Sequence, residues 1–164
     1  MTRTERAWEV LAGVLDPEVP ALSVRDLGIV RDVIDHGDEL EVVLTPTYSG
    51  CPATEVIEQS VLDALKADGL GPARATLRRA PAWTTDWISD DGKRKLREYG
   101  IAPPAHVLPD GGVPIRIMRR EPAVPCPHCG SAQTERTSAF GSTACKSLHR
   151  CLDCREPFEY FKPI

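Results

Sequence analysis

Long apolar runs are missing from this chain of 164 residues. No stretch approaches the roughly 20 apolar residues that a membrane-spanning helix needs. The N-terminal sequence MTRTERAWEVLAGVLDPE carries charges throughout and lacks the apolar core of a secretion signal. Internal repeats and low-complexity tracts are also absent. We therefore expect a globular, cytoplasmic protein without a membrane partner, whose cysteines stay reduced.

Two motifs of redox enzymes are missing as well. The chain has no E-x-x-H pair of the kind that holds iron in carboxylate bundles, and no long four-helix pattern. It also has no G-x-G-x-x-G phosphate loop for a dinucleotide. We therefore assign no catalytic residue and expect no enzyme activity from the chain by itself.

The chain also lacks an excess of basic charge, with 20 Lys and Arg against 24 Asp and Glu. Residues 1–111 hold 12 basic and 19 acidic residues, a net −7, whereas residues 112–164 hold 8 and 5, a net +3. The second stretch has no dense basic run and few aromatic rings, so we expect no nucleic-acid partner. The charge changes at a stretch rich in proline and glycine, PPAHVLPDGGVP. We predict a first domain at residues 1–102, a linker at 103–120 and a second domain at 121–164.

Apolar periodicity in the first domain alternates between helix and strand. Residues 4–15 and a stretch that starts near Pro52 repeat every three to four positions, which predicts amphipathic helices. Residues 29–35 and 39–45 predict strands around a His-Gly-Asp hairpin, and residues 73–81 a third strand. A short polar helix at residues 90–100 follows. The predicted order is that of an α+β sandwich, with helices on one face of a small sheet.

One isolated cysteine, Cys51 in TPTYSGCPATE, lies where a predicted strand gives way to a helix. We expect Cys51 at the N-cap of that helix or beside it, where backbone N–H groups favour a thiolate. The hydroxyls of Thr45, Thr47 and Ser49 can add hydrogen bonds. The alternative is that Cys51 is a small hydrophobic residue that fills a gap under the helix. Ser or Asp would cap a helix better than Cys, which favours a functional role for this thiol.

A second polar group, in DPEVPALSVRDLGIV, precedes the first predicted strand. Asp16, Glu18 and Asp26 are common choices for turns and caps. The functional alternative is that Asp16 or Glu18 folds near the Cys51 loop and helps to hold a metal or orient a partner.

These motifs together resemble the small domain of SufT-like iron–sulfur assembly factors. The resemblance covers about residues 5–85 and is carried by a D-P-E-V start, D-L-G-I before the first strand, and T-P-T-Y-S-G-C-P at the strand-to-helix junction. It implies that the domain handles iron or iron–sulfur cargo, with Cys51 central and with Asp16 and Glu18 as less secure supporting residues.

Two C-x₂-C knuckles mark the second domain, at Cys126 and Cys129 in CPHCG and at Cys151 and Cys154 in CLDC. Two such knuckles turn four sulfurs towards one point, which suits a structural Zn²⁺ in a zinc ribbon. A segment this short has too little core to fold alone, so the metal would supply folding energy. A rubredoxin-like iron or an iron–sulfur cluster uses the same ligands and stays an alternative.

Cys145 is left over from this pattern, and we interpret it as a partly buried cysteine of the ribbon or a replacement ligand. CKSLHRCLDC only nearly fits the plant-type cluster spacing, because its first gap is too long. His128 and His149 flank the knuckles, and we do not expect them to be ligands, because four sulfurs already complete a tetrahedral site.

The chain combines a first domain that contains TTDWI with a four-cysteine ribbon that contains FGSTACK. This combination resembles the D subunits of bacterial phenylacetyl-CoA epoxidase systems. This resemblance implies an accessory subunit in aerobic phenylacetate breakdown that matures or delivers the iron or iron–sulfur centre of the oxygenase or its reductase. It implies those subunits as partners and transient iron or a cluster at Cys51. A structural adaptor, or an electron carrier that uses the C-terminal cysteines, is the alternative, and a homodimer is left open.

Overall fold

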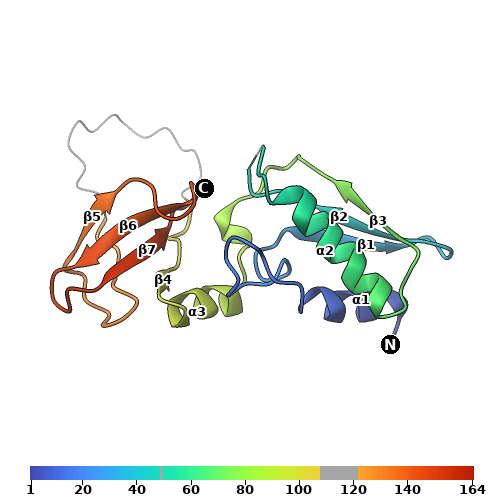
Figure 1. Ribbon diagram of the computed structural model, residues 1–164, viewed down its shortest axis with the longest axis horizontal. Coiled ribbons are helices and arrows are strands. Elements are labelled where there is room, and N and C mark those ends of the chain that lie inside the picture. Colours follow the sequence, from blue (N-terminus) through green and yellow to red (C-terminus); the bar gives the residue numbers. More distant parts are fainter. Residues whose placement is uncertain (49, 108–121) are drawn as a thin grey trace. The chain divides into compact units, whose positions relative to one another are not determined.

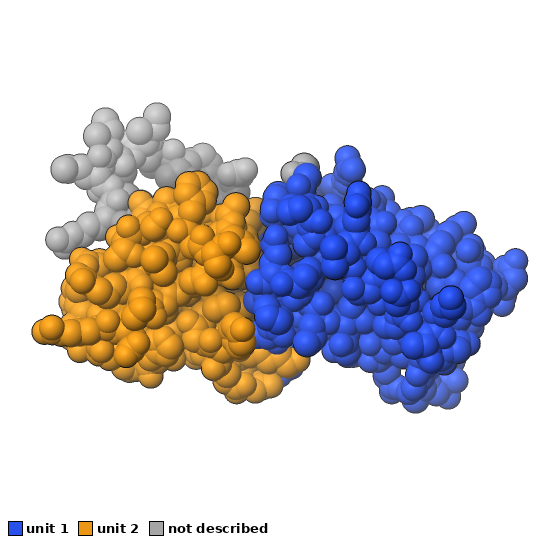
Figure 2. Space-filling model, in the orientation of Figure 1, with its two compact units in different colours: residues 1–92 blue, residues 93–164 orange. Residues whose placement is uncertain are grey.

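The computed structural model describes residues 1–48, 50–107 and 122–164. These residues form two compact units, residues 1–92 and 93–164 (Figures 1 and 2). The division falls earlier than the predicted boundary after residue 102, because β4 (Ile101–Ala102) pairs with a strand of the second unit. Most of the predicted linker, residues 103–120, lies outside the described residues. No helix in the described ranges is long and apolar enough to cross a membrane.

The first unit has the helix and strand order that the sequence predicts. It consists of α1 (Arg3–Leu11), β1 (Val30–Asp35), β2 (Leu40–Leu44), α2 (Thr54–Ala67), β3 (Ala73–Leu77) and the 3₁₀ turn η1 (Thr85–Trp87). The sheet has the order β1-β2-β3, with β1 antiparallel and β3 parallel to β2. α2 therefore provides the crossover that a parallel pair of strands requires.

The two helices and the sheet of the first unit share one apolar core. Leu40, Val42 and Leu44 alternate along β2 and are fully buried, as the strand pattern predicts. The buried residues of the helices lie at helical spacing: Ala7 and Leu11 on α1, and Ile57, Val61 and Leu65 on α2. α1 packs on β1 and α2, and α2 packs on β3. The α+β class predicted for this domain is thereby confirmed.

The first helix is shorter than predicted. A capping box between Thr2 and Glu5 starts α1. The helix ends at Leu11, and Leu15, the last residue of the predicted helix, is 55% exposed. Leu15 instead forms an isolated bridge with Ser23, because the chain has already turned towards the Asp16 loop.

The segment that contains TTDWI packs on the turn before β1. Gly28 has a φ of +70°, and a Cβ there would lie 2.6 Å from the carbonyl oxygen of Trp87. The indole N–H of Trp83 donates to the carbonyl of Leu27 over 2.8 Å, and the Arg31 guanidinium stacks 3.7 Å above the Trp87 ring. The glycine of DLG is thus needed both for its backbone angle and for the close approach of Trp87.

The second unit contains the last part of α3 (Asp90–Glu98) and a four-stranded sheet. Its strands are β4, β5 (Thr134–Ser138), β6 (Lys146–Cys151) and β7 (Pro157–Phe161), in the order β4-β7-β6-β5. β6 is antiparallel to both β5 and β7, and β4 is parallel to β7. This is the β-ribbon that the cysteine pattern predicted, with an added edge strand.

Candidate metal centre and cargo thiol

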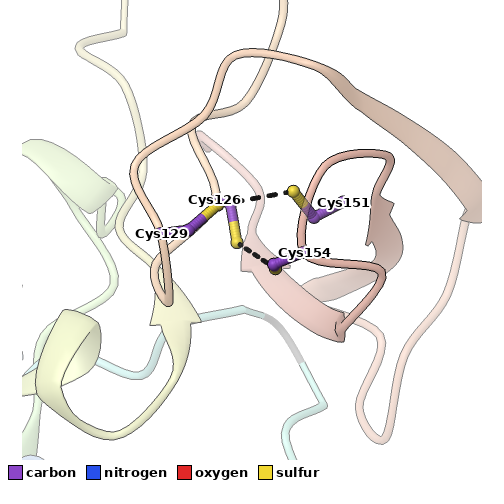
Figure 3. Close-up of side chains that lie close together, drawn as sticks. All are labelled: Cys126, Cys129, Cys151 and Cys154. Atoms are coloured by element: carbon purple, nitrogen blue, oxygen red, sulfur yellow. Dashed lines mark hydrogen bonds between the residues drawn. The ribbon is translucent and has the colours of Figure 1, made fainter.

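The four knuckle cysteines converge on one point (Figure 3). The Sγ atoms of Cys126 and Cys154 are 3.7 Å apart, those of Cys129 and Cys151 are 3.6 Å apart, and all four lie within 4.8 Å of one another. A disulfide is excluded, because an S–S bond measures about 2.05 Å. Four ligands about 2.3 Å from a single ion form a tetrahedron with edges of about 3.8 Å. The donor set and the spacing therefore fit one tetrahedral metal ion.

Backbone hydrogen bonds fold each knuckle around its sulfurs. In the first knuckle the N–H of Gly130 donates to the carbonyl of Cys126 over 2.8 Å, and Gly130 has a φ of +77°. In the second the N–H of Cys151 donates to the carbonyl of Glu156 over 3.0 Å, and Arg155 has a φ of +65°. A residue with positive φ after each C-x₂-C lets the chain turn back, so that both sulfurs of a knuckle face the same side.

The pKa values of the knuckle thiols are shifted in different directions. The backbone N–H of Cys154 donates to the Cys151 sulfur and lowers the pKa of that thiol to about 7. The N–H of Glu156 favours the Cys154 thiolate, but burial and the neighbouring cysteines outweigh it and raise the pKa of Cys154 to about 12. Four negative charges this close together require a cation, and metal binding would release the remaining protons.

Apolar side chains surround the cluster on the inside of the unit. Cys126 and Cys151 are buried together with Ala102, Val124 and Phe158, whereas Cys129 is exposed. The metal centre is therefore part of the small core of this unit and is shielded on one side only. Such a position is typical of a structural site that closes a fold.

Three further residues that the sequence singled out lie outside the cluster. Cys145 is buried, and its Sγ lies 2.9 Å from the hydroxyl of Thr143. His149 is buried, and its Nε2 forms a 2.9 Å hydrogen bond with the Ser147 hydroxyl. His128 lies against Gly100. In the described part of the chain, the only group of three or more potential metal ligands is the four-cysteine cluster.

Cys51 lies in a turn before α2 and not at its N-cap. Its N–H donates to the carbonyl of Tyr48 over 3.3 Å, in a turn that places Gly50 at a φ of +83°. Its own carbonyl accepts the N–H of Thr54, and α2 starts there with Ala53 as its N-cap. The predicted N-cap position is therefore wrong, because an additional turn separates Cys51 from the helix. Cys51 is partly exposed, so it does not simply fill a buried gap.

The predicted supporting hydroxyls differ in their surroundings. Thr45 is 1% exposed, its N–H donates to Ile29, and its Oγ1 has no hydrogen-bond partner among the described residues. Thr47 is partly buried, and Ser49 lies outside the described residues. A buried hydroxyl without a partner is rare and usually has a reason.

The acidic residues of the DPEVP segment form turns. Asp16 is 5% exposed, and its Oδ1 accepts the N–H groups of Glu18 and Val19 over 2.9 and 2.7 Å. Asp26 and Ser23 exchange two hydrogen bonds of 3.0 Å between side chain and backbone. These contacts are the turn and capping contacts that the residue types favour. Asp16, Glu18 and Cys51 do not make a three-ligand site among the described residues.

Together, the fold and the site define a class of protein: an α+β domain with a partly exposed cysteine before its second helix, followed by a metal-binding four-cysteine β-ribbon. Family models match both parts, an iron–sulfur cluster assembly protein at residues 4–76 and a PaaD zinc β-ribbon domain at residues 111–162. The crystal structure of a DUF59 domain from Bacillus anthracis is similar to the first part. It has a TM-score of 0.54 and 25% identity, and the match covers 57% of this chain and 91% of that one.

A relative extends the likeness to nearly the whole chain. A protein of Escherichia coli (strain K12), provisionally named as the D component of 1,2-phenylacetyl-CoA epoxidase, is 47% identical over 157 residues. These residues are 96% of this chain and 91% of the relative. The chain therefore belongs to the family of phenylacetyl-CoA epoxidase D subunits, and the resemblance inferred from the sequence is confirmed.

Ser147 and His149 form a buried polar pair of the second unit that was not predicted from the sequence, where His149 was noted only as flanking a knuckle. Both lie on β6 two positions apart, so they point to the same face of the sheet. The alternation of these two polar residues with Leu148 is a strand signal, but the sequence analysis assigned no residue range to the strand β6.

Proposed function

We propose that this chain is a non-catalytic accessory subunit of a phenylacetyl-CoA oxygenase system, and that it helps to mature or deliver the iron or iron–sulfur centre of that system. The observation that carries the proposal is the partly exposed Cys51 in a domain of the iron–sulfur assembly type. The name of the Escherichia coli relative supplies the pathway. The other subunits of the oxygenase and its reductase would be the partners.

Cys51 would carry the cargo in transit. A single thiolate is one ligand, and the described part of the chain places no other two candidate ligands beside it. Iron or a cluster at Cys51 would therefore take its remaining ligands from a client subunit or from a second copy of the chain. Incomplete coordination suits a carrier, because cargo that is held by one protein ligand is released easily.

The four-cysteine centre would hold one structural zinc ion. Sulfurs that all lie within 4.8 Å of one another suit a single ion, since a cluster with several irons separates its outer ligands further. Zinc needs no open coordination position and no redox chemistry in such a closed site. The ribbon would then be a rigid module for docking to partner subunits.

The test is co-production of the client oxygenase and its reductase with this chain, as wild type or as Cys51→Ser. We expect the purified oxygenase or reductase to contain several-fold less iron with Cys51→Ser, while zinc in the ribbon stays at one per chain. Cys145→Ser is the matched control, because that thiol is buried beside Thr143 and lies outside the four-cysteine cluster. It should leave client iron unchanged.

Two other results would each point to another function. If Cys51→Ser leaves client iron unchanged but Cys154→Ser disrupts assembly of the complex, the chain is an adaptor. If the isolated chain contains iron with visible absorption that survives Cys51→Ser and disappears in Cys151→Ser, it is an electron carrier. Metal analysis and absorption spectra of anaerobically purified protein separate these outcomes.

A further inference from the structure

The second unit contains a cavity of about 830 Å³ beside the metal centre. This volume is within the range of small-molecule sites, about 300–1,000 Å³. One wall is apolar and rich in proline, with Pro103, Pro104 and Pro125 among its residues. Nothing in the metal-centre chemistry requires a cavity at this place, since the four cysteines close their own site.

Another part of the lining is one face of the β-sheet. Arg136 on β5 pairs with His149 on β6, and Ser147 on β6 pairs with Tyr160 on β7. All four side chains line the cavity. Side chains that alternate along three neighbouring strands thus form a continuous polar floor.

The floor is fixed before any ligand binds. Ser147 and His149 are 2% and 6% exposed and are joined by a 2.9 Å hydrogen bond. The His149 ring stacks on Phe158 and meets the edge of Tyr160, with both ring centroids 5.5 Å away. A buried and hydrogen-bonded polar pair of this kind orients a ligand at little cost in entropy.

The charges of the lining have one sign. Arg97, Arg136 and Lys162 contribute cations, whereas the described lining contains no aspartate or glutamate. The acidic Glu159 of β7 lies on the other face of the sheet, where its carboxylate pairs with Lys146 over 3.6 Å. The described lining therefore combines cationic and apolar side chains.

We propose that this cavity binds a small organic anion, with an apolar body along the proline-rich wall and an acidic group near Arg136 and Arg97. The chemistry that selects the ligand is a carboxylate or phosphate attached to an aromatic or aliphatic group. The proposal is independent of the cargo role of Cys51, because none of its residues belongs to the Cys51 loop.

The test uses three probes of nearly equal size on the full chain: 1-naphthylacetate, its neutral amide 1-naphthylacetamide, and 1-naphthyl phosphate. Calorimetry measures affinity, and ¹⁵N–¹H NMR shifts at Val124, Ser147 and Tyr160 locate the site. We expect at least one of the two anions to saturate at one per chain, and the amide to bind about tenfold more weakly. The stronger of the two anions identifies a carboxylate or a phosphate as the preferred group.

Two variants test the cationic and the apolar residues of the lining. Arg136→Gln should weaken anion binding about tenfold. Ala123→Phe, which inserts a ring into the cavity, should abolish the NMR shifts. Arg150→Gln is the control, because Arg150 lies on β6, pairs with Glu135 and does not line the cavity. It should bind like the wild type, and unchanged zinc content in all three variants shows that the fold is intact.

Three results would overturn the proposal. One is equal binding of 1-naphthylacetamide and 1-naphthylacetate. Another is unchanged affinity in Arg136→Gln. The third is the absence of saturable binding by any probe, which would mean that the cavity is filled by protein. None of these results bears on the iron content of a client, so the failure of this proposal and that of the cargo function are separable.

Discussion

At the scale of single residues, the buried hydroxyl of Thr45 can be tested for a role in stability and for a role at the Cys51 site. Its Oγ1 has no partner among the described residues, and an unpaired buried hydroxyl is unfavourable for folding. Thr45→Val keeps the β-branched shape and removes that hydroxyl. We expect the free energy of unfolding to rise by about 1 kcal/mol. Urea unfolding monitored by circular dichroism measures this change.

Thr76→Val is the matched control for Thr45→Val, because the Thr76 hydroxyl donates to Glu41 over 2.7 Å. This variant should be destabilised. If Thr45→Val were also destabilised, the hydroxyl of Thr45 would have a partner in solution. If Thr45→Val is more stable but delivers less iron to the client oxygenase, then the hydroxyl serves the Cys51 site.

A second residue-scale prediction concerns Gly28. Its φ is +70°, and a Cβ at this position would lie 2.6 Å from the Trp87 carbonyl oxygen, so Gly28→Ala adds both backbone strain and a steric clash. We expect a loss of about 3 kcal/mol in the free energy of unfolding, of which about 1–2 kcal/mol is backbone strain. Gly37→Ala is the control, because Gly37 has a φ of +92° with open space around it. Equal losses in the urea unfolding of both variants would show that packing of Trp87 contributes nothing.

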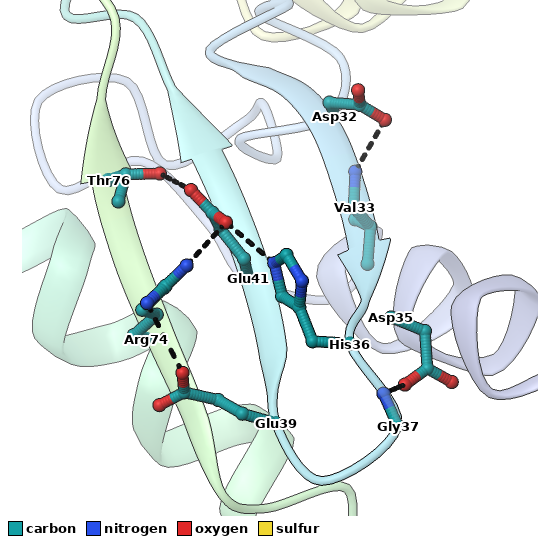
Figure 4. A network of polar contacts seen from close by, with 9 residues as sticks. All are labelled: Asp32, Val33, Asp35, His36, Gly37, Glu39, Glu41, Arg74 and Thr76. Atoms are coloured by element: carbon teal, nitrogen blue, oxygen red, sulfur yellow. Dashed lines mark hydrogen bonds and ion pairs between the residues drawn. The ribbon is translucent and has the colours of Figure 1, made fainter.

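At the scale of elements, the sheet of the first unit has a polar network on one side (Figure 4). Glu41 on β2 accepts hydrogen bonds from Arg74 and Thr76 of β3 and shares one with His36 of the hairpin. These bonds, with that of Arg74 the strongest, lower the pKa of Glu41 from its usual value of 4.5 to about 2. The network links β2 to β3, where Glu41 and Arg74 are paired, and ties both strands to the hairpin between β1 and β2.

This network predicts acid sensitivity. Because the pKa of Glu41 is lower in the folded state, its contribution to stability is complete above pH 4.5 and is lost as the pH falls towards 2. Glu41→Gln should lower stability at pH 6 and reduce its dependence on pH in this range. Urea unfolding between pH 2.5 and 6 measures this. Glu39→Gln should have the smaller effect, since Glu39 lies 3.5 Å from Arg74; the opposite ranking would contradict the assignment.

At the scale of the whole molecule, the two units differ in what stabilises them. The first has an apolar core of two helices and a sheet, whereas the core of the second includes the sulfurs of Cys126 and Cys151. Metal binding to such ribbons contributes about 10–16 kcal/mol to folding. We therefore expect a strong chelator to unfold the second unit and leave the first folded.

The measurement is a ¹⁵N–¹H NMR spectrum before and after chelation. Amide signals of β5, β6 and β7 should lose their dispersion, and those of β1, β2 and β3 should persist. Readdition of Zn²⁺ should restore the original spectrum. A second unit that stays folded without metal would show that its apolar contacts alone are sufficient, and the metal would then have another role.

Sequence reasoning predicted the features that depend on a few neighbouring residues. The order of helices and strands follows from local apolar periodicity, and the four-cysteine cluster follows from two knuckles of fixed spacing. Both signals are short in range, so they are present in the sequence itself. The turn chemistry of Asp16 and Asp26 was also among the alternatives that the residue types suggested.

Tertiary structure decided the features that depend on residues far apart in the chain. The extra turn that removes Cys51 from the N-cap, the lone hydroxyl of Thr45 and the packing of Trp87 on Gly28 have no local signal. The cavity beside the metal centre depends on side chains from α3, from four strands and from the segments that connect them. Packing of whole elements sets such contacts, because the free energy of burial depends on which surfaces meet and not on the pattern within one segment.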